Sequence, residues 1–82
     1  MAQAKDTKGK NLMQGDHFFV TNLKDPGVPE NYVPDLGGFV RKVPKRGILY
    51  VGIQTSLGLR YTTLKSRSVK KSGKAYAIDN AF

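Results

Sequence analysis

Two clusters of basic side chains give this 82-residue sequence its clearest chemical signal. The first cluster contains four cations, Arg41, Lys42, Lys45 and Arg46. The second contains five, Lys65, Arg67, Lys70, Lys71 and Lys74, with three serines among them whose hydroxyls can donate hydrogen bonds to phosphate oxygens. Lysine and arginine gathered in this way neutralise phosphates and release counterions. The spacing therefore predicts binding to a polyanion.

The signs of charge are segregated along the chain. Residues 36–74 hold ten of the 14 basic residues, Arg60 among them, and none of the six acidic ones. An ordinary soluble surface mixes both signs, whereas a field of one sign concentrates and steers anions. A solvated face or an import signal would also be basic. Two clusters without an intervening acid favour a nucleic-acid footprint over both alternatives.

The same sequence offers little for catalysis. His17 is the only histidine, there is no cysteine, and no nucleophile motif accompanies a base. Asp16 and His17 provide too few ligands for a metal ion, and Gly37-Gly38 precedes no helix that would make a phosphate loop. We expect no enzyme, no catalytic residue, no metal and no cofactor.

Aromatic side chains beside cations would add base stacking to phosphate contacts. Tyr50 opposes the apolar face of its strand, so we expect its ring to point outward near Arg41 or Lys42. Tyr32, in a loop, is a second candidate contact ring.

Other rings are assigned to packing. We expect Phe18, Phe39 and Tyr61 in the core. Phe18 and Phe19 are adjacent, so they face opposite sides of one strand and cannot both enter one core. The ring that stays outside the core needs another surface to bury it, which favours a homodimer.

The elements that must position these side chains are predicted to be strands. β-branched and aromatic runs punctuated by glycine and proline indicate five of them, at residues 17–23, 39–43, 48–53, 59–64 and 75–78. No segment has convincing helical periodicity. Three prolines and three glycines make residues 24–38 a long loop.

Five short strands favour an all-β barrel, since closure removes exposed edges. The architecture resembles the SH3-like type, whose long first loop matches residues 24–38. It is preferred over the OB-like type, because residues 54–58 are too short for the helix that type carries. Residues 1–13 are expected to be a flexible basic arm, and residues 14–82 a single domain.

Composition indicates where in the cell the protein is expected. No run of 18 apolar residues is present, so no membrane partner is expected. The absence of cysteine and of an apolar N-terminal stretch favours a cytoplasmic protein, or one associated with a nucleoid or virion.

The predicted function is binding of DNA or RNA, mainly through the phosphate backbone and with low sequence specificity. The expected binding residues are Arg41, Lys42, Lys45, Arg46, Tyr50, Arg60, Lys65, Arg67, Lys70, Lys71 and Lys74. The first alternative is a small interaction module or inhibitor that docks on an acidic protein partner through its proline-rich loop. The second is a ribosomal or virion component whose N-terminal arm threads through nucleic acid.

Overall fold

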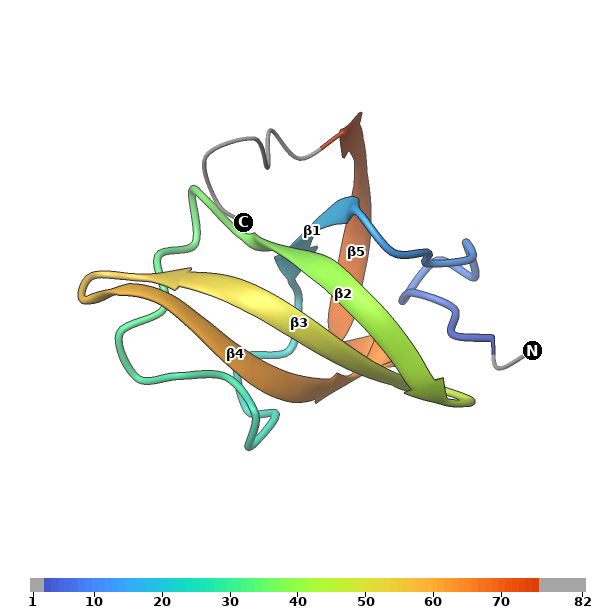
Figure 1. The fold of residues 1–82 in the computed structure, drawn as a ribbon, viewed down its shortest axis with the longest axis horizontal. Coiled ribbons are helices and arrows are strands. Elements are labelled where there is room, and N and C mark those ends of the chain that lie inside the picture. Colours follow the sequence, from blue (N-terminus) through green and yellow to red (C-terminus); the bar gives the residue numbers. More distant parts are fainter. Residues whose placement is uncertain (1–2, 76–82) are drawn as a thin grey trace.

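The computed structural model describes residues 3–75, without the side chains of Lys74 and Ala75. Its elements are β1 (Asp16–Val20), β2 (Gly38–Lys45), β3 (Ile48–Thr55), β4 (Gly58–Lys65), the short 3-10 helix η1 (Ser66–Ser68) and β5 (Val69–Ala75) (Figure 1). The all-β class is confirmed. No helix among the described residues is long and apolar enough to span a bilayer.

The strands form one antiparallel sheet in the order β4-β3-β2-β1-β5. β2 is the central strand: its start lies beside β1, and its full length runs along β3 (Figure 1). Within the described residues β4 and β5 are the two edges, so the sheet is not closed. The predicted five-stranded count is confirmed, and closure into a barrel is not.

One hydrophobic core is shared by all five strands. Phe18 of β1, Val40 of β2, Leu49, Val51 and Ile53 of β3, Leu64 of β4 and Val69 of β5 belong to the same buried cluster. Because both edge strands contribute side chains to this one cluster, the sheet must curve so that its two edges approach each other across its inner face. Side chains that do not belong to this core occupy the outer face of the sheet.

The N-terminal segment differs from the flexible arm predicted for residues 1–13. Ala4 and Leu12 are buried in the core, and the side chain of Asp6 is fully buried. The Asp6 carboxylate accepts hydrogen bonds from the backbone N–H groups of Lys8, Lys10 and Lys71, each at 2.8 Å. The described residues 3–13 are therefore a packed segment, because one carboxylate ties their turn to β5.

The fifth strand begins earlier than predicted. β5 starts at Val69, whereas the sequence indicated residues 75–78, of which only Ala75 lies within the described residues. Lysines at positions 70 and 71 hide the alternation of a strand. Backbone pairing with β1 defines β5 instead, with Phe18 opposite Lys71 and Phe19 opposite Lys70.

The long loop between β1 and β2 is anchored by a buried carboxylate. Asp25 accepts hydrogen bonds from the backbone N–H groups of Gly27 (2.9 Å) and Lys65 (3.1 Å) and from the hydroxyl of Ser68 (2.7 Å). Burial opposes ionisation of Asp25, but these donors and the nearby charge of Lys65 outweigh it and hold the pKa of Asp25 below its usual value. The loop therefore fixes the backbone at the junction of β4 and η1.

Candidate nucleic-acid interface

Two consecutive cations of β2 lie over tyrosine rings on the outer face of the sheet. The Arg41 guanidinium is 4.7 Å from the centre of the Tyr61 ring, and the Lys42 ammonium is 5.7 Å from the centre of the Tyr50 ring. Neighbouring residues of a regular strand face opposite sides. The register shifts between Val40 and Lys42, and a bulge of this kind re-aims a side chain.

The two tyrosines form a pair. Their ring centres are 6.2 Å apart and their planes differ by 25°. Tyr61 is 43% exposed, so its predicted place in the core is wrong, whereas the outward position of Tyr50 near Lys42 is confirmed. Arg60, an expected binding residue, lies on the opposite face of β4 from Tyr61, because neighbouring residues of a strand face opposite sides.

A glycine makes room for these rings. A Cβ atom at Gly52 would lie 2.6 Å from Cζ of Phe39 and 3.2 Å from Cε1 of Tyr61. Phe39 is buried, as predicted, but it lies on the outer face instead of in the main core, while Phe18 is in that core. The absence of a side chain at Gly52 thus lets the rings of Phe39 and Tyr61 approach the backbone of β3 closely.

A cationic pocket of about 420 Å³ adjoins this face. It opens where the N-terminal segment, the β2–β3 turn and the β4–η1 junction meet. Its lining contains four exposed cations, Lys5, Arg46, Lys65 and Arg67, together with Gln3, Gly47, Ile48 and Ser66. Its volume falls within the range of roughly 300–1,000 Å³ typical of small-ligand sites.

Hydrogen bonds hold the walls of this pocket together. The N–H of Gly47 donates to the carbonyl oxygen of Gln3, and the N–H of Ser66 donates to the carbonyl oxygen of Gly47, each at 2.9 Å. Nη1 of Arg67 donates to the carbonyl oxygen of Asp6 at 3.2 Å, which orients the guanidinium. Because its walls are bonded to one another, the pocket is largely pre-formed.

The pocket and the tyrosine pair lie on the same face of the sheet. Lys65, Thr63 and Tyr61 are alternate residues of β4, so their side chains share one face and succeed each other at about 6.8 Å. Lys65 lines the pocket, and Thr63 pairs directly with Tyr50. The pocket cations and the tyrosine pair are therefore neighbours.

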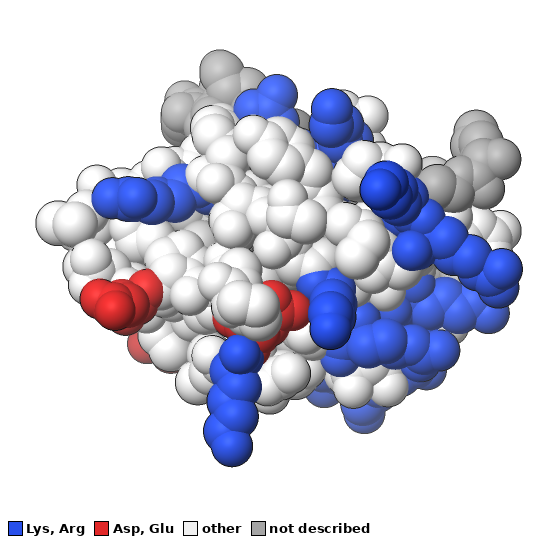
Figure 2. Space-filling model, turned by 90° about the horizontal axis from the view of Figure 1, so that it is seen from below, with Lys and Arg blue, Asp and Glu red and all other residues white. Residues whose placement is uncertain are grey.

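The charges of the described surface are unevenly distributed. Figure 2 shows most visible Lys and Arg side chains toward the end that carries the β2–β3 turn and the N-terminal segment in Figure 1, with the visible carboxylates at the centre and the other side. The four pocket cations form no ion pair with a carboxylate of residues 3–75.

The predicted binding residues are only partly brought together. Arg41, Lys42 and Tyr50 lie on the outer face, Arg46, Lys65 and Arg67 line the pocket, and Lys45 pairs with the pocket residue Ile48. Arg60, Lys70 and Lys71 lie elsewhere, and the side chain of Lys74 is outside the described part of the chain.

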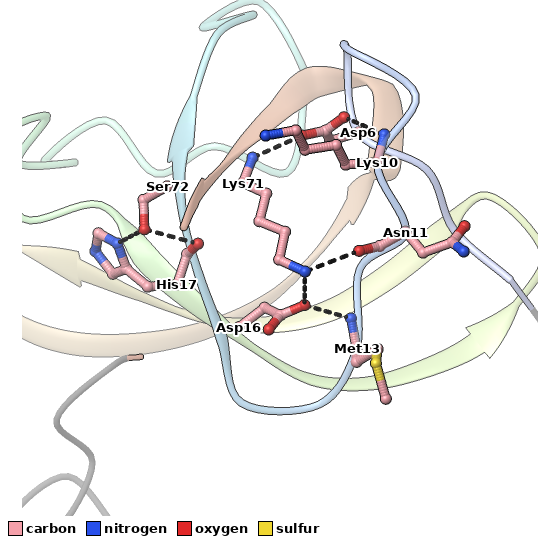
Figure 3. A network of polar contacts seen from close by, with 8 residues as sticks. All are labelled: Asp6, Lys10, Asn11, Met13, Asp16, His17, Lys71 and Ser72. Carbon is pink, nitrogen blue, oxygen red and sulfur yellow. Dashed lines mark hydrogen bonds and ion pairs between the residues drawn. The ribbon is translucent and has the colours of Figure 1, made fainter. Parts of the chain in front are cut away.

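Lys71 has a structural partner. Its ammonium lies 3.3 Å from the Asp16 carboxylate and donates to the carbonyl oxygen of Asn11 at 3.4 Å, next to the Asp6 contacts (Figure 3). Asp16 also accepts a hydrogen bond from the N–H of Met13. Lys71 thus fastens the N-terminal segment to β1 and β5.

Two residues singled out from the sequence serve packing. The Nε2 of His17 donates a hydrogen bond to the carbonyl oxygen of Leu36 at 2.8 Å, and its Nδ1 is hydrogen-bonded to the Ser72 hydroxyl at 2.7 Å. The rings of His17 and Phe19 pack edge-on, with their centres 4.8 Å apart. The Phe19 ring therefore has a partner within the chain. Tyr32 packs against the core, and its hydroxyl accepts a hydrogen bond from the N–H of Val20.

Sequence reasoning missed Lys5 and Gln3 as pocket residues because both fell in the expected flexible arm. The signal that could have found the segment is Asp6, an acid placed before a Thr-Lys-Gly turn, where a carboxylate can accept backbone N–H groups. Comparisons with models of protein families, with curated proteins and with solved structures found no match.

Proposed function

We propose that the protein binds single-stranded nucleic acid on the outer face of β2, β3 and β4. The arrangement of Arg41 and Lys42 over the Tyr61–Tyr50 pair carries this proposal. Single-strand binders combine a cationic track for the backbone with rings on which unpaired bases stack. A paired base in a duplex offers no free ring face, so single strands suit this surface better.

Low sequence specificity accompanies this mode. Ring stacking is tolerant of base identity, and phosphate contacts carry no sequence information. The surface has the tyrosine pair and six nearby cations, Arg41, Lys42, Lys45, Arg46, Lys65 and Arg67. Binding therefore depends on charge and strandedness more than on sequence.

We also propose that the fold is of the SH3-like barrel type. The two-residue turn Ser56-Leu57 joins β3 and β4, where an OB-like barrel usually carries a helix, and this supports the proposal. The long loop between β1 and β2 fits the SH3-like plan.

The test compares fluorescence anisotropy titrations with labelled single-stranded DNA, single-stranded RNA and duplex DNA of equal length. We expect either single strand to bind more tightly than the duplex at the same salt concentration. Equal or tighter binding of the duplex would contradict the stacking role of the tyrosines, and absence of binding to all three would contradict the function.

A pocket in the long loop favours a second candidate, docking of a protein partner. It has a volume of about 290 Å³, is lined mainly by apolar residues of the loop, and includes Leu23, which is 61% exposed. An apolar hollow beside an exposed leucine suits an apolar side chain of a partner. The alternative with a threading N-terminal arm loses its support, because residues 3–13 are packed.

A further inference from the structure

The charge concentrated in the pocket exceeds what one internal phosphate of a strand requires. A phosphodiester carries a single negative charge, and the sheet face already supplies Arg41 and Lys42 along the proposed strand path. The pocket adds four more cations around a single hollow. A phosphate monoester carries about −1.5 to −2 at neutral pH and offers three strong acceptor oxygens, so it matches the pocket better.

We infer that this pocket binds a terminal phosphate monoester of the nucleic-acid strand whose bases stack on Tyr50 and Tyr61. The inference rests on the proposed function, because it assigns the pocket to one end of the same bound strand. Lys65 lies next in the row beyond Thr63 on the face that carries Tyr61, so a strand on the tyrosines reaches the pocket within the span of neighbouring side chains.

The donors are of kinds that bind phosphate well. Arg46 and Arg67 present planar guanidinium groups that bond two oxygens at once, and Lys5 and Lys65 add mobile ammonium groups. Arg67 is oriented by its bond to the Asp6 carbonyl oxygen. The Asp25 carboxylate lies near Lys65, but it accepts hydrogen bonds from Gly27, Lys65 and Ser68 within the fold, so it does not replace the phosphate.

The decisive comparison uses three single-stranded oligonucleotides of one sequence: with a 5′-phosphate, with a 3′-phosphate and with hydroxyls at both ends. One phosphorylated form should bind about tenfold more tightly than the hydroxyl form, since the extra charge meets several partly exposed cations. Equal affinity of all three would overturn the inference while leaving the proposed function intact.

The variants Arg46→Ala and Lys65→Ala locate the effect. Neither side chain makes a hydrogen bond or ion pair within residues 3–75, so both variants should fold, and both should reduce the advantage of the phosphorylated strand. Lys24→Ala, an equal change of charge in the long loop, should keep it. Retention of the full advantage in the Arg46→Ala, Lys65→Ala double variant would overturn the assignment to this pocket.

A free phosphate compound is the other source of the same chemistry. Adenosine monophosphate and inorganic pyrophosphate are therefore added as competitors of the phosphorylated strand. Weak competition by both supports binding of a strand end. Binding of either compound to protein that binds no oligonucleotide would overturn the inference together with the proposed function, and would assign the pocket to a free anion.

Discussion

The guanidinium of Arg41 lies 4.7 Å from the centre of the Tyr61 ring, although the two residues belong to the non-adjacent strands β2 and β4. On β3, Tyr61 pairs with Gly52, whose partner on β2 is Phe39, two residues before Arg41. Because Gly52 has no side chain, nothing at that position keeps the Tyr61 ring away from β2. A cation over a tyrosine at an exposed site stabilises the pair by about 0.5–1 kcal/mol. In the proposed binding mode, this contact holds the Tyr61 ring in place for a base to stack on it.

Removing that ring should weaken binding to single strands. For Tyr61→Ala we expect a loss of about 1–3 kcal/mol in binding free energy, because one base loses its stacking partner. Anisotropy titration with a single-stranded oligonucleotide measures it. Leu57→Ala, which truncates a residue that is 73% exposed at the β3–β4 turn, is the control and should bind like the parent. Unchanged affinity of Tyr61→Ala would exclude the ring from the interface.

Side chains at the β2–β3 turn should contribute to binding through their charge. The double variant Lys45→Ala, Arg46→Ala removes two cations, so the slope of log K against log salt should become shallower by about 1.4 for a single strand. Lys24→Ala combined with Lys70→Ala removes the same charge elsewhere and should change the slope less. If both double variants gave the same slope, the turn would have no special part in binding.

A substitution at Gly52 should affect both the stability of the fold and the binding of single strands. A Cβ atom there would lie 2.6 Å from the Phe39 ring, closer than atoms can approach without displacement. We expect Gly52→Ala to destabilise the fold by about 1–3 kcal/mol, as overpacking does, and to weaken binding of single strands by displacing Tyr61. Gly47→Ala, where a Cβ meets no atom within 4 Å but φ is +76°, tests backbone strain without overpacking. Urea denaturation that shows no loss in Gly52→Ala would disprove the close contact.

The N-terminal segment should be required for stability. Asp6→Ala leaves three backbone N–H groups without their acceptor, and we expect a loss of about 2–3 kcal/mol, or roughly 10 °C or more in Tm. Asp35→Ala, at an exposed loop position, should leave Tm nearly unchanged. Thermal unfolding followed by circular dichroism distinguishes the two. A Tm of Asp6→Ala equal to that of the parent would contradict the packed segment and support the flexible arm predicted from the sequence.

Acid should destabilise the protein through Asp6 and Asp25, the two buried carboxylates of residues 3–75. Burial opposes ionisation of Asp6 and Asp25, but their hydrogen-bond donors and the charges of nearby lysines outweigh it, so each pKa lies below its usual value of 3.8. A pKa that is lower in the folded than in the unfolded state stabilises the fold above the unfolded value, and this contribution disappears as pH falls through the folded value. The free energy of unfolding should therefore decrease below about pH 4.

The variant Asp25→Asn isolates one of these carboxylates. It keeps the shape of the side chain, removes the titration, and should lessen the decrease between pH 5 and pH 2, at the expense of stability at pH 7. Urea denaturation across this pH range, compared with Asp35→Asn, provides the measurement. An identical pH profile for Asp25→Asn and the parent would show that Asp25 does not titrate differently in the two states.

Hairpin strands could be predicted from local sequence. Gly47 with φ +76° and Gly58 with φ +110° stand at the β2–β3 and β3–β4 turns, and apolar alternation in β3 identifies the buried side chains. The first four strands were therefore found to within a few residues. β5 was misplaced because its lysines and Gly73 give no periodic pattern, and its position follows from pairing with β1.

The candidate site was predictable in kind more than in detail. The segregation of charge along the chain pointed to the cations of the candidate site, and the alternation of apolar residues in β3 predicted that Tyr50 points outward. The bulge that turns Lys42 toward the same face as Arg41 depends on the register with β3, which no local pattern reveals. The pocket joins Lys5, Arg46 and Arg67, three residues far apart in the chain, and Arg67 is hydrogen-bonded to the carbonyl oxygen of Asp6. Only the folded chain brings these together.

The central claim is that the cations beside the tyrosine pair act as one surface on a single strand. The salt dependence of affinity for a single-stranded oligonucleotide of about 12 nucleotides tests it most directly, because each neutralised phosphate contributes about −0.7 to the slope of log K against log salt. With hydroxyls at both ends of the oligonucleotide, so that each of Arg41, Lys42, Lys45, Arg46, Lys65 and Arg67 meets an internal phosphate, the slope should be near −4. A slope shallower than about −1.5 would mean that no more than two phosphates are neutralised, and would contradict a continuous cationic face.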